Sequence, residues 1–458
     1  MLSHKALSLL FLVGLLWCGA ASAESAIVAG PMVGYGTHHE VAIWVQTQRP
    51  ARVRIQYWPM GKTDQARMSD GLRTKALLQN TALIQVRDLQ PGTRYHYALW
   101  LDEASTPLVF DYPLGFQTQP MWRRFKDRGP PEFVVAFGSC AYTNDPDFEP
   151  ASAYGGGYEI YDSIRKQSPD LMLWLGDNVY FRASDWGSPT GLFRRYARAR
   201  ALPQLQALLA STHNYAIWDD HDYGPNDSNR SYVHKGHALE AFKRYWANPS
   251  YGLPTTPGVF TQFTWGDVDF FLLDNRFYRS PSNAPRDGSK TQFGAAQFQW
   301  LVDGLTASRA PFKIVAAGGQ FLSPFDRWEG SAQFPHEQQA LTDMIIQRRI
   351  SGVVFLSGDR HHTELVSIKP DGFYPLYDFT SSPLTSRGAS ADGEWKSQVR
   401  VPGTLVTKQR NFGLLKFDGP IKDRVLTLES RATDGRLLWT QTVKARALRP
   451  MPKKKVAP

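Results

Sequence analysis

Polar side chains with metal-binding or acid–base chemistry occur at five places in the sequence, each directly after a short apolar run. Runs such as residues 133–137 and 353–356 are typical of strands that are buried on both faces. A single Gly-Asp or Asp-His pair is weak evidence, because turns after strands often carry these residues. Five coincidences instead predict one shared site. The residues are Cys140, Asp177 with Tyr180, Asp219-Asp220-His221, Gln320 and Asp359-Arg360-His361.

The predicted chemistry of this site is that of bound metal ions. The carboxylates of Asp177, Asp220 and Asp359 would repel one another, and a multivalent cation removes that cost. Oxygen ligands favour a hard ion such as calcium, whereas the softer donors Cys140 and His361 favour iron or zinc. We therefore expect a mixed site, with zinc or another divalent ion as the alternative. Two ions a few ångströms apart would hold a phosphate and activate a water for in-line hydrolysis.

Three further residues are candidates for catalysis or substrate binding. His221 could donate a proton to the leaving group, bind metal, or make a structural hydrogen bond, and we favour the first. Asn226 could reach a phosphate oxygen or cap its own loop. Arg276 could contact substrate, although pairing with Asp274 is the simpler expectation.

The first 23 residues have the pattern of a secretory signal peptide. His4 and Lys5 precede an apolar run from Leu7 to Trp17, and Ala21-Ser22-Ala23 provides small residues for cleavage after Ala23. We expect a periplasmic or extracellular protein with no membrane-spanning segment after cleavage. Removal of the signal peptide would also remove Cys18, so that Cys140 is left without a disulfide partner. A metal-bound thiolate explains such a cysteine, and an inert buried thiol is the alternative.

Two regions with different patterning follow the signal peptide. From 24 to 120, alternating stretches at 41–46, 53–58, 82–86 and 95–100 predict a small antiparallel β-sandwich, and the segment from Leu89 to Tyr97 resembles the turn and tyrosine of fibronectin type III domains. Residues 121–131 read as a linker.

The region from 132 to 443 alternates apolar strands with helices. Strands are expected at 133–137, 171–175, 215–218, 314–317 and 353–356, and helices at 158–167, 237–247, 295–308 and 336–348. This order predicts a largely parallel sheet covered by helices, in which ligands bind beyond the carboxyl ends of the strands. A basic tail is expected from 444 to 458.

The motifs of this second region are similar to those of a known family. Gly138-Ser139-Cys140, Gly176-Asp177-Asn178-Val179-Tyr180, the Asp219-Asp220-His221 segment and Ser357-Gly358-Asp359-Arg360-His361 follow one another in the order found in PhoD-type alkaline phosphatases. The resemblance covers about 130–390. It implies a metallophosphatase core of two sheets flanked by helices, behind a β-sandwich. It also implies alkaline phosphatase activity, with phosphodiesterase or phospholipase D-like activity in some members.

The same resemblance implies a specific set of ligands. A ferric ion would be bound by Cys140, Asp177, Tyr180 and His361, and Asp177 would bridge to calcium held by Asp220 and Asp359. Gln320 stands where the wider superfamily has a histidine ligand. Many family members carry a twin-arginine signal, which this sequence lacks.

Composition limits the possible partners. The net charge of +10 is dispersed, and no nucleic-acid-binding motif is present, so we expect a phosphate ester as the partner and a monomer as the oligomeric state. A lipid phosphodiesterase is one alternative, supported only by the basic tail. A non-catalytic envelope-binding protein with a metal-stabilised scaffold is the other.

Overall fold

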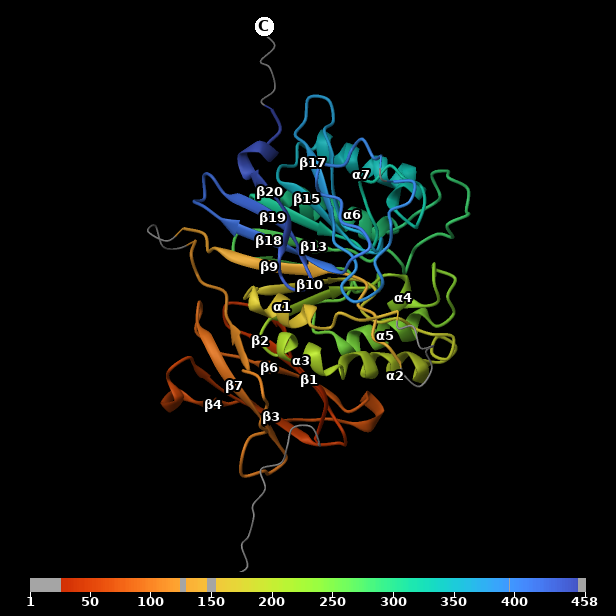
Figure 1. Ribbon diagram of the computed structural model, residues 1–458. Helices are drawn as coiled ribbons and strands as arrows, with labels where there is room; N and C mark the ends of the chain where they lie inside the picture. The colour runs from red at the N-terminus through yellow and green to blue at the C-terminus, as the bar shows by residue number, and fades with distance from the viewer. Residues whose placement is uncertain (1–25, 124–128, 146–153, 395, 452–458) are drawn as a thin grey trace, which may run out of the picture.

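The structure is a computed structural model that describes residues 26–123, 129–145, 154–394 and 396–451. The predicted signal peptide therefore lies outside the described residues, as does the end of the predicted tail. A β-rich N-terminal part packs against a larger part that contains both sheets and helices (Figure 1).

The N-terminal part consists of two antiparallel sheets around a hydrophobic core of its own. Alternation of buried and more exposed residues, as in Arg52–Pro59, gives a strand one face that packs on this core, whereas Val41–Thr47 is buried along its whole length. The four strands expected from the sequence are β2, β3, β6 and β7. One sheet contains β1 (Ile27–Gly36), β2 (Val41–Thr47) and β6 (Thr81–Val86), and the other contains β3 (Arg52–Pro59), β4 (Arg67–Met68), β5 (Leu72–Arg73), β7 (Arg94–Leu101) and β8 (Gly115–Gln117).

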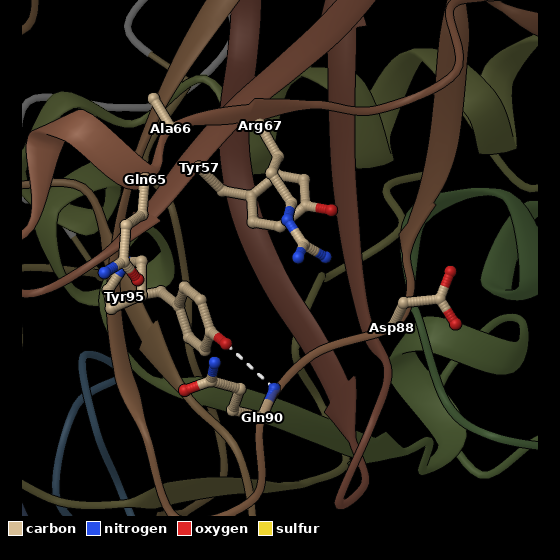
Figure 2. A pocket seen from close by; sticks show the side chains of 8 residues that line it. Tyr57, Gln65, Ala66, Arg67, Asp88, Gln90 and Tyr95 are labelled. Atoms are coloured by element: carbon tan, nitrogen blue, oxygen red, sulfur yellow. Dashed lines mark hydrogen bonds between the residues drawn. The ribbon is translucent and has the colours of Figure 1, made fainter.

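A tyrosine braces the turn before β7, as the sequence suggested. The hydroxyl of Tyr95 accepts a hydrogen bond of 2.9 Å from the main-chain N–H of Gln90 (Figure 2). Tyr95 also lines a cavity of about 360 Å³ together with Tyr57, Arg67 and Asp88. The rings of both tyrosines are almost entirely buried, so they mainly support the turn and the core.

The larger part contains two six-stranded mixed sheets. The first has the order β11-β10-β9-β18-β19-β20, and the second has the order β12-β13-β14-β15-β17-β16. The first is built from β9 (Phe133–Gly138), β10 (Leu171–Leu175), β11 (His213–Ile217), β18 (Asn411–Asp418), β19 (Val425–Ala432) and β20 (Leu437–Lys444). The second is built from β12 (Thr261–Trp265), β13 (Val268–Leu272), β14 (Phe312–Ala316), β15 (Val353–Ser357), β16 (Glu364–Ile368) and β17 (Leu376–Thr380).

The two sheets that the family resemblance implied are therefore present, whereas the largely parallel sheet expected from the strand–helix pattern is wrong. The five predicted strands exist, but β9, β10 and β11 lie parallel in the first sheet while β14 and β15 belong to the second. Antiparallel strands extend both sheets, for example β18 beside β9. Alternation of strands and helices shows that crossovers exist, but it does not show which sheet a strand joins.

Helices cover the outer faces of the two sheets. In Figure 1, α1, α2, α3 and α5 lie on the side of β10 and β11, and α6 and α7 lie on the side of β13 and β15. Among the described residues, no helix has the length and apolar character needed to cross a bilayer. The helices are α1 (Ile160–Lys166), α2 (Pro189–Arg200), α3 (Pro203–Leu209), α4 (Asp220–Tyr223), α5 (Lys235–Tyr245), α6 (Ala295–Ala307) and α7 (Pro335–Gln347).

The two parts of the chain are joined by buried hydrogen bonds. His213 of β11 lies between two carbonyl groups of the N-terminal part, 2.8 Å from that of Gly34 and 2.7 Å from that of Gln117. The hydroxyl of Tyr97 donates to the carbonyl of Ala210 over 2.9 Å. The N-terminal part is thus fixed beside β11, one of the strands that lead into the site.

The predicted basic tail begins inside the folded structure. Lys444 is the last residue of β20, and the following turn, Ala445–Leu448, places Leu448 in the core. Residues 452–458 lie outside the described ones.

Candidate metal centre

The ends of strands from both sheets meet in one place. Cys140 follows β9, Asp177 follows β10 and Asp220 follows β11, while Asp359 and His361 follow β15. Donor atoms of these residues lie within 4.8 Å of one another in three overlapping groups. The groups are Cys140 with Asp177 and His361, Asp177 with Asp220 and His221, and Asp219 with Asp220 and Asp359.

Four of these residues adopt the left-handed backbone conformation. The φ angles are 61° at Cys140, 52° at Asp177, 65° at Asp359 and 52° at His361. Such a conformation costs a non-glycine residue about 1–2 kcal/mol. The cost is concentrated at the strand ends, where it turns the side chains toward one another, as is typical of functional sites.

The first donor group combines a thiol, a phenol and an imidazole around one carboxylate. Sγ of Cys140 lies 3.5 Å from Oδ2 of Asp177, and the hydroxyl of Tyr180 lies 3.2 Å from the same oxygen. Nε2 of His361 is 3.2 Å from the Tyr180 hydroxyl. Nδ1 of His361 faces the carbonyl of Arg387 at 2.8 Å, which orients Nε2 toward the group.

The second donor group consists of carboxylates. Asp220 and Asp219 are both buried, and each has one carboxylate oxygen without a hydrogen-bond partner among the described residues. The other oxygen of Asp220 accepts a 2.8 Å hydrogen bond from the main-chain N–H of Asp227. Buried carboxylate oxygens without partners are costly, and a cation would provide the missing interaction.

The pKa values of these groups indicate whether they suit a bound cation. Burial raises the pKa of Cys140 to about 12, and burial together with Asp219 raises the pKa of Asp359 to about 8. Burial and the nearby Asp220 raise the pKa of Asp177 well above its usual value. The ionised forms are therefore unfavourable in this dry cluster of acids. A multivalent cation is the partner that reverses these shifts, so the donor set fits bound metal.

A further aspartate holds two of the strand ends in register. Oδ1 of Asp222 accepts hydrogen bonds from the main-chain N–H groups of Asp219, at 2.6 Å, and of Asp177, at 3.2 Å. Its Oδ2 accepts from the main-chain and side-chain nitrogens of Asn178, at 3.1 and 2.7 Å. Asp222 thus links the turn after β10 to the start of α4.

His221 and Asn226 line a cavity of about 440 Å³ beside the carboxylates. The ring of His221 packs on that of Tyr180, with centroids 4.2 Å apart, and Nε2 is 4.0 Å from Oδ2 of Asp220. Burial lowers the pKa of His221 below its ordinary value.

Arg276 does not form the side-chain pair that its sequence neighbourhood suggested. Asp274 accepts a hydrogen bond from the main-chain N–H of Arg276, whereas the guanidinium binds Asp219 and, at 2.9 Å, Glu329. Arg276 is fully buried, and it stabilises the carboxylates behind the cavity. Gln320 is buried and is not among the residues that line the cavity; its amide nitrogen donates to Glu364 at 2.7 Å and to Thr380 at 2.9 Å.

Other residues that line the cavity were not identified from the sequence. Asp227 directly follows Asn226, and its carboxylate groups with Asp220 and Glu329 within 4.8 Å. Tyr154 and Trp328 also line the cavity. Neither aromatic residue belongs to a strand-end motif, so the spacing of the ligand residues gave no signal for them.

Comparison with known proteins places the chain in a family. The sequence model of the PhoD-like phosphatases matches residues 134–429, which is well over half of the chain. The chain belongs to the PhoD-like phosphatase family. A separate model, described as a domain of unknown function (DUF7800), matches residues 24–114.

Similar proteins agree with the family and the fold. Alkaline phosphatase D of Bacillus subtilis (strain 168) is 25% identical over 380 residues, covering 69% of this chain and 60% of that protein. A solved structure of PhoD matches with a TM-score of 0.75 and 17% identity, covering 93% of this chain and 92% of that one. The purple acid phosphatase PPD1 of yellow lupin (Lupinus luteus) matches with a TM-score of 0.66 and 12% identity, over 95% and 78% of the two chains. These two structures support the fold alone.

Proposed function

We propose that the protein is a secreted, metal-dependent phosphoric ester hydrolase, an alkaline phosphatase that also accepts phosphodiesters. The observation that carries this proposal is the convergence of Cys140, Asp177, Asp220, Asp359 and His361 from two sheets beside one cavity. Membership of the PhoD-like phosphatase family supports the same reaction class. Turnover would exclude the alternative of a non-catalytic binding protein.

The donor atoms support an assignment of two different metals. Cys140, Asp177, Tyr180 and His361 offer sulfur, nitrogen and phenolic oxygen, which suits ferric iron. Asp220 and Asp359, with Asp177 shared between the two groups, offer carboxylate oxygens, which suits calcium. When bound, such ions polarise the phosphate and lower the pKa of a bound water.

The remaining polar residues have roles around the substrate. His221 lies at the cavity wall, where a ring N–H can be donated to the leaving oxygen. Because burial lowers the pKa of His221, the ring is neutral in alkaline solution and acts as a hydrogen-bond donor there. The amide of Asn226, on the same wall, is assigned to a phosphate oxygen.

The proposal also includes the cellular location of the protein and the fold type of its N-terminal part. The signal-peptide pattern of residues 1–23 supports export to the periplasm or beyond. For residues 24–120, the two antiparallel sheets and the bracing Tyr95 support a fibronectin type III-like sandwich.

Hydrolysis of p-nitrophenyl phosphate and bis(p-nitrophenyl) phosphate at alkaline pH, with metal analysis of the purified protein, tests the proposal. We expect release of p-nitrophenol that is abolished by a chelator and by Asp177→Asn. Asp371→Asn is the matched control, because Asp371 is exposed on a turn. Full activity in Asp177→Asn, or none in the metal-loaded wild type, would refute the proposed function.

A further inference from the structure

Trp328 stands out on the surface of the protein. Among the described residues it is the only tryptophan, tyrosine or phenylalanine in the exposed class, with 61% of its surface accessible. It also lines the cavity that contains the carboxylates and His221. Tryptophan side chains are mostly buried in folded proteins. At the edge of a cavity, an exposed indole provides a flat apolar face.

The backbone at Trp328 and Glu329 adopts a conformation that is energetically unfavourable for residues other than glycine. Trp328 and Glu329 both adopt positive φ angles, of 53° and 65°. A bulky residue in this conformation is a genuine outlier, which persists only when the surrounding structure enforces it.

Contacts between Glu329 and two buried arginines hold this backbone conformation in place. Its carboxylate accepts from Nη1 of Arg276 at 2.9 Å, and its main-chain carbonyl accepts from Nη2 of Arg279 at 2.9 Å. Both arginines are fully buried. Arg276 also binds Asp219 beside the metal ligands, so the position of Trp328 is tied directly to the candidate metal centre.

The ring of Trp328 also lies near Arg360, a neighbour in sequence of two candidate metal ligands. The guanidinium of Arg360 lies 5.5 Å from the centroid of the Trp328 ring, and it is held by a 2.6 Å hydrogen bond to Glu394. Arg360 stands between Asp359 and His361 in the chain. A ligand whose phosphate reaches the metal centre therefore has a cation and an aromatic face next to it.

We propose that Trp328 forms an aromatic subsite that selects phosphoric esters carrying a flat aromatic ring, such as the base of a nucleotide. This inference rests on the proposed ester hydrolysis and adds the substrate class. The ring of the substrate stacks on the indole while its phosphate lies at the candidate metal centre, where bound cations would offset the charge of the carboxylates, and Arg360 flanks the stacked pair. Stacking of a base on an aromatic side chain is tolerant of the base's identity, because every base has a π-face.

Adenosine 5′-monophosphate and ribose 5-phosphate test this subsite, because in both the phosphate leaves from a ribose 5-oxygen, and the two differ at C1, which carries the base in one and a hydroxyl in the other. In Trp328→Ala we expect the ratio of kcat/KM for the two esters to fall about tenfold, as the loss of one stacking contact predicts. Trp328→Phe should keep most of the preference. Val109→Ala is the control, because it shortens an exposed apolar side chain of the N-terminal part. A ratio within twofold of the wild type in Trp328→Ala would overturn the subsite.

A binding measurement separates this inference from the proposed function. Calorimetry with phenylphosphonate and methylphosphonate, which are not hydrolysed, requires no turnover. We expect the phenyl compound to bind the wild type about tenfold more tightly, and Trp328→Ala to lose the difference. A phenyl preference in a protein without phosphatase activity would refute the proposed function alone. Equal binding of the two phosphonates by an active wild-type enzyme would refute the subsite alone.

Discussion

The hydroxyl of Tyr180 lies 3.2 Å from Nε2 of His361, although the two residues follow strands of different sheets. Tyr180 belongs to the turn after β10 in the first sheet, and His361 follows β15 in the second. The candidate metal centre is thus assembled across the junction of the two sheets. Bound metal would hold the sheets together there, so ligand variants should affect stability as well as activity.

The first prediction concerns Tyr180 itself. Tyr180→Phe removes the phenolic oxygen that we assign to iron, so iron content, the visible absorption of an iron–phenolate pair and activity should fall together. We expect the loss of activity to be at least about tenfold, the lower range for outer-shell partners of metals. Metal analysis and absorption spectroscopy on the purified variant provide the measurement. Tyr196→Phe is the control, since Tyr196 is buried and its hydroxyl has no partner among the described residues. Retention of the band in Tyr180→Phe would contradict the iron assignment.

The second prediction concerns Asp222, which accepts four hydrogen bonds from nitrogen donors. In Asp222→Asn one oxygen becomes an NH2 group, which would face N–H donors and leave them unsatisfied. We expect a loss of about 2–4 kcal/mol in the free energy of unfolding, because buried unsatisfied groups cost about 1–3 kcal/mol each. Denaturant titration measures this loss, and Asp371→Asn should show almost none. Wild-type stability in Asp222→Asn would show that the four contacts contribute little.

The third prediction contrasts a buried ion pair with an exposed one. Arg276 is fully buried, and Arg276→Ala would leave Asp219 and Glu329 without their shared cation. Breaking such a network costs about 3–5 kcal/mol of unfolding free energy. The pair of Arg286 with Asp326 is about half exposed, so Arg286→Ala should cost less than about 1 kcal/mol. Similar losses in the two variants would contradict this account of Glu329 and Trp328.

The strand ends at which the candidate ligand residues lie could be predicted from the sequence because their signal is local. A run of apolar residues that ends in a polar one, such as 171–175 before Asp177, specifies a buried strand and the position of its end. The strands β9, β10, β11, β14 and β15 were identified in this way, with bounds within about two residues of those observed. Four expected helices are likewise confirmed as α1, α5, α6 and α7.

The features that the sequence did not reveal depend on contacts between distant segments. Arg276 was expected to pair with Asp274 two positions away, but its guanidinium binds Asp219, which is 57 positions distant. The exposure of Trp328 depends on the arginines that hold Glu329, and no periodic pattern encodes such a contact. The assignment of strands to two sheets is a choice of the same kind, because it is decided by packing of the whole chain.

The last prediction concerns the pH dependence of stability and involves Lys313, which is not among the candidate metal ligands. Lys313 lies in β14, where its amino group donates to the carbonyls of Ala310 and Ser351 at 2.8 and 2.9 Å. Burial lowers the pKa of Lys313 from 10.5 to about 8, while Asp269 acts weakly in the opposite direction. Because the folded pKa lies below the unfolded one, the folded state binds fewer protons, and the charged form opposes folding.

The sign of the pH effect follows from that shift. The penalty is fully present below about pH 8 and disappears as the pH rises toward 10.5, so this group makes the wild type relatively more stable in alkaline solution. Lys313→Met carries no such group. Between pH 7 and 10.5 the difference in unfolding free energy should therefore shift in favour of the wild type by about 3 kcal/mol. Denaturant titrations of both proteins at the two pH values measure this shift, and the effects of other titrating groups cancel. Lys422→Met is the control, because it replaces an exposed lysine by the same residue. A pH-independent difference for Lys313→Met would mean that the amino group has the same pKa in the folded and unfolded protein.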